Sequence, residues 1–488
     1  MLLSFAALAL VSACGLTSGK GDGETHWLGC KSSIDCKRGF ECTRRDDAGT
    51  ESSCTPSPML QSTGACPAEA DTLAASGFPD RPNTVGCLAT IWTKNFSGLS
   101  PSAGSALSVD RHGNVIVTAD ADPRVTVDLG GGPIEPIRSI SPSTAVLTDV
   151  VLAKFTPDGN VLFSRRFPGW DPSIVVDGFD AIWVVFHDAQ DPRSHLWKLD
   201  PGGRTLWQGS AAGLSVPAVG PSGVVLAGQA SRHESFGAGS MVSLDADFTD
   251  GSANDGTGAF LAAFDGAGRQ RWAAWGSPAP GEPPTPFMDA QKVGDVTQLP
   301  DGRAVLLAST VRLLGGPAIA TAYSLFETFD PAGKAVDQWW IPPDAGPATG
   351  IGRITSDSRG NVIGIPRNTS DFVVTKLDGA TYRVLWGRPW LGNLGSADSI
   401  ATDACDDIVV AGPSVDTVDF GGGPLQPAPT FVAKYGPSGG HLCSRTFSLS
   451  GPRPASVATA PTGEVFLVAF VTTDSSSGTG ASLMKLAP

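Results

Sequence analysis

Short apolar runs, each ending at a tight turn that contains Gly or Asp, recur seven times along the chain. The first strand of each unit, together with its turn, is predicted at Leu107–Asn114, Val175–Ala181, Pro217–Val224, Val296–Arg303, Ile354–Asn361, Ile400–Asp407 and Val457–Glu464. A second apolar strand follows each turn directly, and a third follows after a connection of variable length. Self-similarity at intervals of about 40 to 80 residues indicates that one supersecondary unit is repeated along the chain.

Small Gly-containing turns predict how the strands of each unit are joined. The first and second strands are linked by turns such as DRHGN (110–114), and the third and fourth by turns such as TPDGN (156–160). Such turns between apolar strands are hairpin signals, so each unit is predicted to be a four-stranded antiparallel meander. Seven meanders packed face to face around an axis form a seven-bladed β-propeller, an all-β fold that buries both faces of each sheet.

The predicted fourth strands share an aromatic residue at one position, and the two ends of the repeat complement each other. The aromatic residues are Trp92, Phe163, Trp207, Trp272, Trp339 and Trp386. We interpret them as packing between blades, in preference to stacking on a cofactor. The seventh unit ends at Pro488 after three strands, whereas Leu88–Phe96 has the pattern of a fourth strand and precedes the first unit. We therefore predict that this N-terminal strand completes the last blade.

These motifs resemble the seven-bladed propeller repeats of secreted bacterial proteins. The match rests on HGNVIVTAD (112–120), DVVLAKFTPDGNVLFSRRF (149–167), FVAKYGPSGGHLCSRTF (431–447) and the two segments VDLGGGP (127–133) and VDFGGGP (418–424). It covers residues 88–488 and is strongest in the first and sixth units. The resemblance implies the propeller fold and export from the cell, but it implies no particular activity.

The N-terminal segment resembles the signal peptide of a bacterial lipoprotein. Residues 1–14 form an apolar run that ends in Val11-Ser12-Ala13-Cys14, which is similar to a lipobox. This resemblance implies that Cys14 is lipidated, so that the protein is anchored in the outer membrane or at the cell surface. We expect a signal peptide at 1–14, a tether and Cys-rich head at 15–66, a connector at 67–87 and the propeller at 88–488.

Eight cysteines remain after Cys14. An even number is what complete pairing in disulfide bonds requires, so the cysteines support export to an oxidising compartment. Four of them, Cys30, Cys36, Cys42 and Cys54, lie in a short polar segment and suggest a knot of two bridges, whose connectivity stays open. Their spacing favours this knot over a zinc site, since it contains no C-x-x-C. We expect Cys66 and Cys87 to close the connector, and Cys405 and Cys443 to be either a bridge within the sixth blade or two buried thiols.

Charge and motif spacing exclude several classes of function. The net charge of −14 disfavours binding to nucleic acid or to an anionic membrane surface. No spacing of His, Cys, Asp or Ser predicts a catalytic centre or a metal site, and we expect no cofactor. The loop at 244–258 leaves open a structural calcium ion, but its register does not fit an EF-hand. The recurring Asp110, Asp177, Asp357 and Asp403 are interpreted as turn-stabilising residues rather than cation ligands.

The lengths of the connections indicate where a ligand would bind. All long connections are predicted on one face of the propeller, and residues on loops held by a rigid scaffold often bind ligands. The candidate ligand-binding residues, chosen by location, are Arg124, Asp128, His233, Asp250, Asp416 and Asp419. We expect a monomeric lipoprotein that binds a protein, peptide or glycan of the cell envelope or its surroundings. The alternatives are a quinoprotein-like enzyme and a scaffold lipoprotein for envelope assembly.

Overall fold

The computed structural model divides the chain into two compact units, Met1–Ala65 and Cys66–Pro488, each of which is considered by itself. The residues that it describes are 40–44, 52–56, 86–99, 105–137, 148–188, 191–211, 213–221, 223–231, 257–276, 291–313, 320–341, 351–366, 373–394, 397–449, 456–472 and 479–488. In the first unit, β1 (Phe40–Arg44) pairs with β2 (Ser52–Pro56) in an antiparallel hairpin. The pairing predicted for the four cysteines of the head lies outside what the structure describes.

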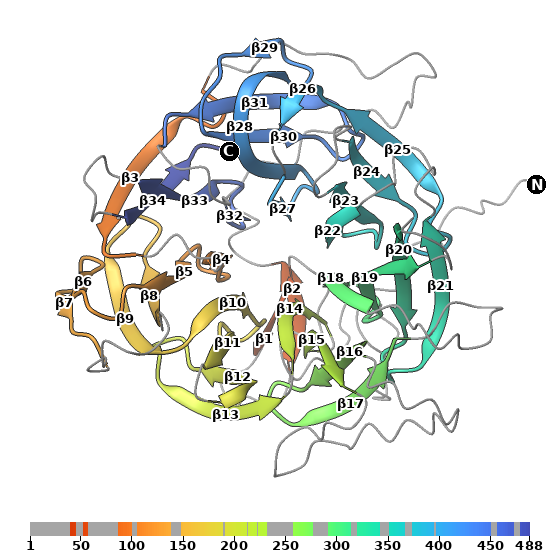
Figure 1. The fold of residues 1–488 in the computed structure, drawn as a ribbon, viewed down its shortest axis with the longest axis horizontal. Helices are drawn as coiled ribbons and strands as arrows, with labels where there is room; N and C mark the ends of the chain where they lie inside the picture. Colours follow the sequence, from red (N-terminus) through yellow and green to blue (C-terminus); the bar gives the residue numbers. More distant parts are fainter. Residues whose placement is uncertain are drawn as a thin grey trace, which may run out of the picture. The chain divides into compact units, whose positions relative to one another are not determined.

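The second unit is a seven-bladed β-propeller whose blades are four-stranded antiparallel sheets, as predicted (Figure 1). The first three blades are β4 (Ser105–Val109), β5 (Val115–Ala121), β8 (Asp149–Phe155) and β9 (Val161–Pro168); β10 (Trp170–Val176), β11 (Ile182–Asp188), β12 (Asp191–Leu199) and β13 (Thr205–Ala211); and β14 (Leu214–Gly220), β15 (Gly223–Ser231), β16 (Thr257–Phe264) and β17 (Gln270–Trp275).

The other four blades follow in chain order around the ring. They are β18 (Gln291–Gln298), β19 (Ala304–Leu313), β20 (Ala320–Phe329) and β21 (Ala335–Ile341); β22 (Ile351–Ser356), β23 (Val362–Pro366), β24 (Val373–Leu377) and β25 (Val384–Pro389); β27 (Ser399–Thr402), β28 (Ile408–Asp419), β30 (Thr430–Tyr435) and β31 (His441–Phe447); and β32 (Ser456–Thr459), β33 (Val465–Thr472), β34 (Thr479–Leu486) and β3 (Thr90–Ser97).

Two short hairpins are added to this plan at the outer edge of the ring (Figure 1). In the first blade, β6 (Val127–Asp128) pairs with β7 (Pro133–Ile134). In the sixth, the end of β28 pairs with β29 (Pro424–Leu425) and with β26 (Leu391–Leu394). These hairpins are the two VDxGGGP segments of the sequence.

The N-terminal strand completes the last blade, which confirms the predicted ring closure. Strand β3 pairs with β34 from Thr90 opposite Leu486 to Ser97 opposite Gly480. Two further backbone hydrogen bonds join Leu88 and Ala89 to Ala487 at distances of 3.2 and 2.8 Å. The closing strand thus covers the edge of β34, which would otherwise be open to pairing with another chain.

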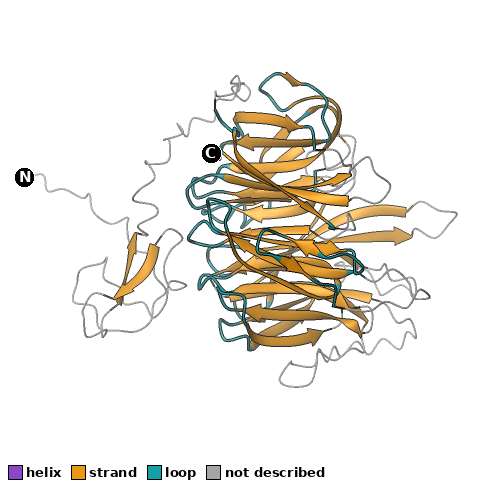
Figure 2. Ribbon diagram, turned by 90° about the vertical axis from the view of Figure 1, so that its left-hand side faces the viewer, coloured by secondary structure: helices purple, strands orange, loops and turns teal. Residues whose placement is uncertain are grey.

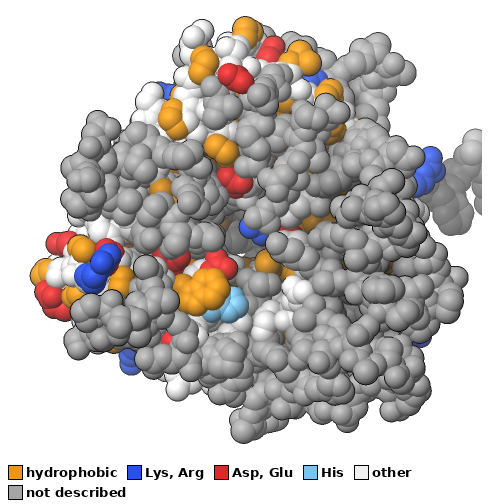
Figure 3. All heavy atoms as spheres, in the orientation of Figure 1, with side chains coloured by type: hydrophobic (Ala, Val, Ile, Leu, Met, Phe, Trp, Pro, Cys, Tyr) orange, Lys and Arg blue, Asp and Glu red, His pale blue; other side chains and the backbone are white. Residues whose placement is uncertain are grey.

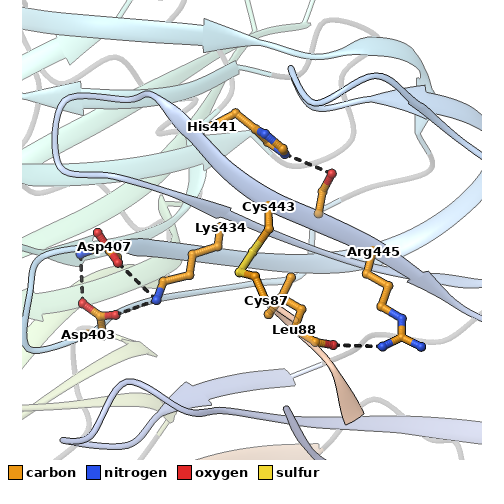
Figure 4. The surroundings of a disulfide bond; sticks show 9 residues. Cys87, Leu88, Asp403, Asp407, Lys434, His441, Cys443 and Arg445 are labelled. Atoms are coloured by element: carbon orange, nitrogen blue, oxygen red, sulfur yellow. Dashed lines mark hydrogen bonds and ion pairs between the residues drawn. A yellow bond between two sulfur atoms is a disulfide. The ribbon is translucent and has the colours of Figure 1, made fainter. Parts of the chain in front are cut away.

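A disulfide bond links the closing strand to the neighbouring blade, and it corrects both predictions for these cysteines. Cys87 bonds to Cys443 of β31, with their Cα atoms 6.2 Å apart (Figure 4). Cys87 therefore does not close the connector with Cys66, and Cys443 neither bridges to Cys405 nor is a free thiol. Cys405 is disulfide-bonded as well. The predictions were wrong because they paired cysteines within one segment, whereas the fold brings the start of β3 against β31.

The core lies between the blades, as the packing of apolar sheet faces requires. A representative cluster joins the first and last blades through Val117, Phe155, Phe466 and Leu483, all of which are buried. All the elements that the structure describes are strands (Figure 2). Among the described residues, no helix is long and apolar enough to cross a membrane.

The strands run between two faces that differ in their connections. We call the "turn face" the side that carries the turns between first and second and between third and fourth strands, and the "connection face" the opposite side. In Figure 2 the short turns gather along one side of the edge-on propeller.

Candidate functional site

The aspartates that recur on the turn face cap their own turns. One carboxylate oxygen of Asp110 accepts hydrogen bonds from the backbone N–H groups of His112 and Asn114, at 2.9 and 2.8 Å. Asp357 does the same for Arg359 and Asn361. Asp177 and Asp403 bind the N–H groups of their turns in the same way. The expected turn-stabilising role is confirmed for all four.

Each of the same carboxylates forms a buried ion pair with a lysine from the third strand of its own blade. Lys154 Nζ lies 2.8 Å from Asp110, and the two side chains are 3% and 0% exposed. The equivalent pairs are Lys198 with Asp177, Lys376 with Asp357, and Lys434 with Asp403 and Asp407. In the seventh blade the first turn position is Ala460, and Lys485 pairs instead with Glu464 at the fifth position. Five blades therefore carry one version of this device.

Attraction to their partners favours the charged forms of Lys434 and Asp357 in spite of burial. Burial opposes the charged form of Lys434, but the attraction of Asp403 and Asp407 outweighs it, so the pKa of the lysine is raised. Burial likewise opposes ionisation of Asp357, but hydrogen bonds from Lys376 and Asn361 outweigh this effect and lower its pKa. Both groups are charged near neutral pH. Lys434 is engaged by Asp403 and Asp407, and Asp357 by Lys376, so neither is available to a ligand.

The lysine and the aromatic residue beside it also reach the next blade. Lys154 of the first blade donates a hydrogen bond to the carbonyl of Pro201 in the second blade at 3.1 Å. Trp92 of the seventh blade donates to the carbonyl of Pro157 in the first blade at 3.0 Å. The receiving turns pack closely on the rings: a Cβ atom at Gly203, where φ is +83°, would lie 2.6 Å from Phe163. Only glycine fits there, because the backbone is left-handed and the ring fills the space. The aromatic residues pack between blades, as predicted.

The fourth blade departs from the pattern and corrects one residue of the aligned aromatic set. Strand register places Asp337, not Trp339, opposite Thr328 at the position held elsewhere by the aromatic residue. Trp339 lies two residues further on and stacks on Tyr382 of the fifth blade, with ring centroids 5.8 Å apart. The Tyr382 hydroxyl is hydrogen-bonded to Thr328, and burial raises its pKa to about 12. The neutral hydrogen bond between Thr328 and Tyr382 thus takes the place of the lysine–aspartate ion pair of other blades.

The sixth blade replaces the aromatic residue by a covalent bond. Cys443 lies opposite Lys434, in the register position of Phe163 or Trp207. In other blades this position reaches the turn between the third and fourth strands of the next blade. In the seventh blade that turn is absent, because its two strands come from opposite ends of the chain. The disulfide with Cys87 fastens the one junction where no continuous turn is available.

The structure describes four of the six predicted ligand-binding residues, and these four belong to two different blades. Asp128 and Asp419 each cap an equivalent hairpin, accepting from Gly130 and from Gly421 at 2.7 Å, and these hairpins lie at the outer edge of different blades (Figure 1). Arg124 is exposed and pairs with Asp122 at 3.0 Å.

Of the other three candidates, the structure describes Asp416. Asp416 is exposed on β28 in the sixth blade, where its backbone carbonyl accepts a hydrogen bond from Ser414. His233 and Asp250 lie outside the described residues. No group of His, Cys, Asp or Glu suited to a metal ion occurs within the described part of the chain. Ligand contact by the six residues stays a prediction.

A cluster on the connection face was missed by the sequence interpretation. Trp170, the first residue of the channel-lining strand β10, is 44% exposed although it is one of the largest apolar side chains. It lies opposite His187 of β11, and their rings are 4.7 Å apart at 32°. His187 in turn lies opposite Ser194 of β12, whose buried hydroxyl is 3.1 Å from its Nδ1. Figure 3 shows a histidine beside a large hydrophobic side chain near the centre of this face.

The backbone around Trp170 is held in an unusual conformation. Gly169 has φ +153°, and a Cβ atom there would lie 2.6 Å from Phe186. Asp171 has φ +51°, which is rare for a residue with a side chain. Its N–H donates to Asp120 of the first blade at 3.0 Å. Strain of this kind is found at functional sites, where the surrounding structure fixes a side chain in place.

The electrostatics of the cluster keep its histidine neutral. Burial lowers the pKa of His187 below its usual 6.5; the negative charge of Asp171 opposes this effect, and His195 adds to it. The imidazole that supports Trp170 is thus uncharged at neutral pH, with Nδ1 within hydrogen-bond distance of Ser194. The sequence contains one signal for this site: a Gly-Trp-Asp-Pro segment (169–172) opens the second unit, where no other unit has a tryptophan.

Comparison with known proteins finds similarity among solved structures only, at low sequence identity. No protein-family model matches the chain, and no curated protein matches it significantly. Among solved structures, the Dos1 propeller is similar, with 8% identity, a TM-score of 0.41 and coverage of 81% of this chain and 95% of that chain. A protein of unknown function from Dyadobacter fermentans has 9% identity, a TM-score of 0.41 and coverage of 83% and 100%.

Proposed function

We propose that the protein is an exported lipoprotein whose propeller is a non-catalytic binding module for a protein, peptide or glycan of the cell envelope or its surroundings. The ligand-binding surface is the connection face, with its centre at Trp170. The anchor in this proposal is lipidated Cys14, as the lipobox-like segment at 11–14 suggests.

The observation that carries the proposal is the contrast between the polar groups of the two faces. On the turn face the recurring carboxylates and lysines are buried and paired with one another. On the connection face a large aromatic side chain is exposed and its backbone is fixed. A rigid, exposed aromatic residue is the kind of anchor that dominates binding interfaces.

A capture experiment tests the binding proposal. The full chain carrying Cys14→Ser, which removes the lipid attachment site, is immobilised and incubated with solubilised cell-envelope material. We expect a component that is retained by this chain and lost when Trp170→Ala is added. Leu206→Ala is the matched control, because Leu206 is 60% exposed on the outer strand of the same blade. Equal retention by all three chains would contradict the proposed site.

Two simpler measurements test the remaining parts of the proposal. Intact-mass analysis of protein extracted from membranes should show an acylated Cys14 at the N-terminus, and a product that starts elsewhere contradicts the anchor. A visible absorption spectrum together with metal analysis of the purified protein should show no bound chromophore. A bound quinone or haem would contradict the non-catalytic interpretation.

A further inference from the structure

The free face of Trp170 is a flat apolar surface that is fixed in space. His187 covers one face of the indole ring, so the exposed part of the side chain includes the opposite face. The backbone on both sides is held, by Thr148 through Gly169 and by Asp120 through Asp171. A ligand that stacks on this ring therefore loses little free energy to ordering the protein.

A hydrogen-bond acceptor follows Trp170 directly in the chain. Asp171 is half-buried, and none of the described residues donates a hydrogen bond to its carboxylate. It is adjacent in the chain to Trp170 and close enough to His187 to influence its titration. A ligand that stacks on the indole could donate hydroxyl hydrogens to this carboxylate, which would fix its orientation.

The surroundings disfavour the other ligand classes. A peptide that adds a strand needs a continuous edge, but β10 is irregular between Trp170 and Ser173, and Pro172 lacks an N–H. Anionic ligands are repelled by the carboxylates and by the net charge of −14. Quaternary ammonium groups are bound by cages of several aromatic rings, whereas the described residues place one exposed ring here.

We propose that Trp170 and Asp171 form a subsite for an uncharged sugar ring, which stacks its C–H face on the indole and donates hydroxyl hydrogen bonds to the carboxylate. The hydrogens of a sugar C–H face carry a partial positive charge, which is attracted to the negative face of an aromatic ring. This inference rests on the proposed function, since it names the ligand class of the same site. His187 and Ser194 support the platform and do not contact the sugar.

The test measures sugar binding directly. The full chain carrying Cys14→Ser is titrated with uncharged oligosaccharides of glucose, galactose and N-acetylglucosamine, and binding is followed by calorimetry and by quenching of tryptophan fluorescence. We expect at least one series to bind, with an affinity that falls more than tenfold in Trp170→Ala and in Asp171→Asn. Trp170→Phe should keep part of the affinity, and Leu206→Ala should keep all of it. Unchanged melting curves show that the variants are folded.

Two outcomes separate this inference from the proposed function. If no sugar binds, but envelope material is still captured through Trp170 and resists periodate oxidation, then the glycan assignment is overturned and the binding module stands. If choline or another organic cation binds through Trp170 and sugars do not, the glycan assignment is likewise overturned. If neither sugar nor envelope material depends on Trp170, both proposals fall.

Discussion

The two faces of this propeller are made by the same strands, but they use polar residues in opposite ways. On the turn face, one arrangement of Asp, Lys and an aromatic residue recurs with small changes from blade to blade, and it joins neighbouring blades. On the connection face, Trp170 and its support by His187 occur once among the described residues. The comparison teaches that repeated residues here stabilise the ring, whereas the candidate for recognition is a residue that breaks the repeat.

The largest expected effect comes from removing the strand that closes the ring, because both faces depend on an intact ring of blades. Deleting residues 88–97 takes away β3 and opens the edge of β34. We expect a chain that aggregates or melts far below the intact protein, because an unpaired strand edge invites association. Thermal melting and light scattering measure this. Deleting 20–65 is the control, since those residues lie in the other compact unit; a stable monomer without 88–97 would contradict the role of the closing strand.

A second change tests whether the turn face carries stability. Lys154→Met should lower the free energy of unfolding by about 3–5 kcal/mol, because it leaves the buried Asp110 without its cation. Chemical denaturation measures the loss. Adding Asp110→Asn should recover part of it, since the uncompensated charge is then gone.

The matched change on the connection face is Arg124→Met, which breaks an exposed ion pair with Asp122. Solvent screens such pairs, so we expect no measurable change in unfolding. Equal losses for Lys154→Met and Arg124→Met would erase the distinction drawn between the faces.

The disulfide predicts a somewhat smaller loss. Replacing Cys87 and Cys443 by Ser should cost about 2–5 kcal/mol, the usual range for removing a native bridge from a folded domain. Melting of the double variant against the oxidised parent measures this cost. The backbone pairing of β3 with β34 should survive, so the variant should remain a folded monomer; complete unfolding would show that the bridge is essential.

Peptide mapping without reduction tests the pairing itself. It should recover Cys87 joined to Cys443. It should also recover Cys405 in a second bridge, to a cysteine other than Cys443. Recovery of Cys405 joined to Cys443 would contradict the structure.

The smallest expected effect concerns pH and the connection face. The pKa of His187 is lower in the folded chain than its ordinary value of 6.5, so the unfolded chain binds the proton more readily. The favourable contribution of the neutral ring is present above pH 6.5 and is lost as the pH falls below it. We expect the melting temperature to drop between pH 7.5 and 5.5, and to drop less in His187→Gln. An identical drop in both chains would assign the acid sensitivity to other groups.

Much of the fold could be predicted from the sequence, because the same pattern of strands and turns recurs in seven units. The strand–turn spacing gave seven blades, and the missing fourth strand after residue 487 gave the closure by Leu88–Phe96. Trp339 was misaligned because residue type was followed rather than distance from the turn, which places Asp337 in register. The cysteine pairs were missed because the relevant neighbours, Cys87 and Cys443, are 356 residues apart and meet only after the ring closes.

The candidate site was harder to predict, because its one signal in the sequence is a departure from the repeat at residues 169–172. Charged residues on long connections were chosen, yet Asp128 and Asp419 cap hairpins of their own. The exposure of Trp170 depends on the left-handed backbone at Asp171 and on its contact with Asp120 of another blade. No property of the local sequence reports those contacts.

The pairing of β3 with β34 has a consequence for the order in which the protein is made. The first strand of the propeller to be synthesised must wait for the last, so the ring cannot close before the whole chain is available. Blades between them can form as they emerge, since each is built from consecutive strands. Cys87 must likewise wait for its partner Cys443, which lies 356 residues further along the chain.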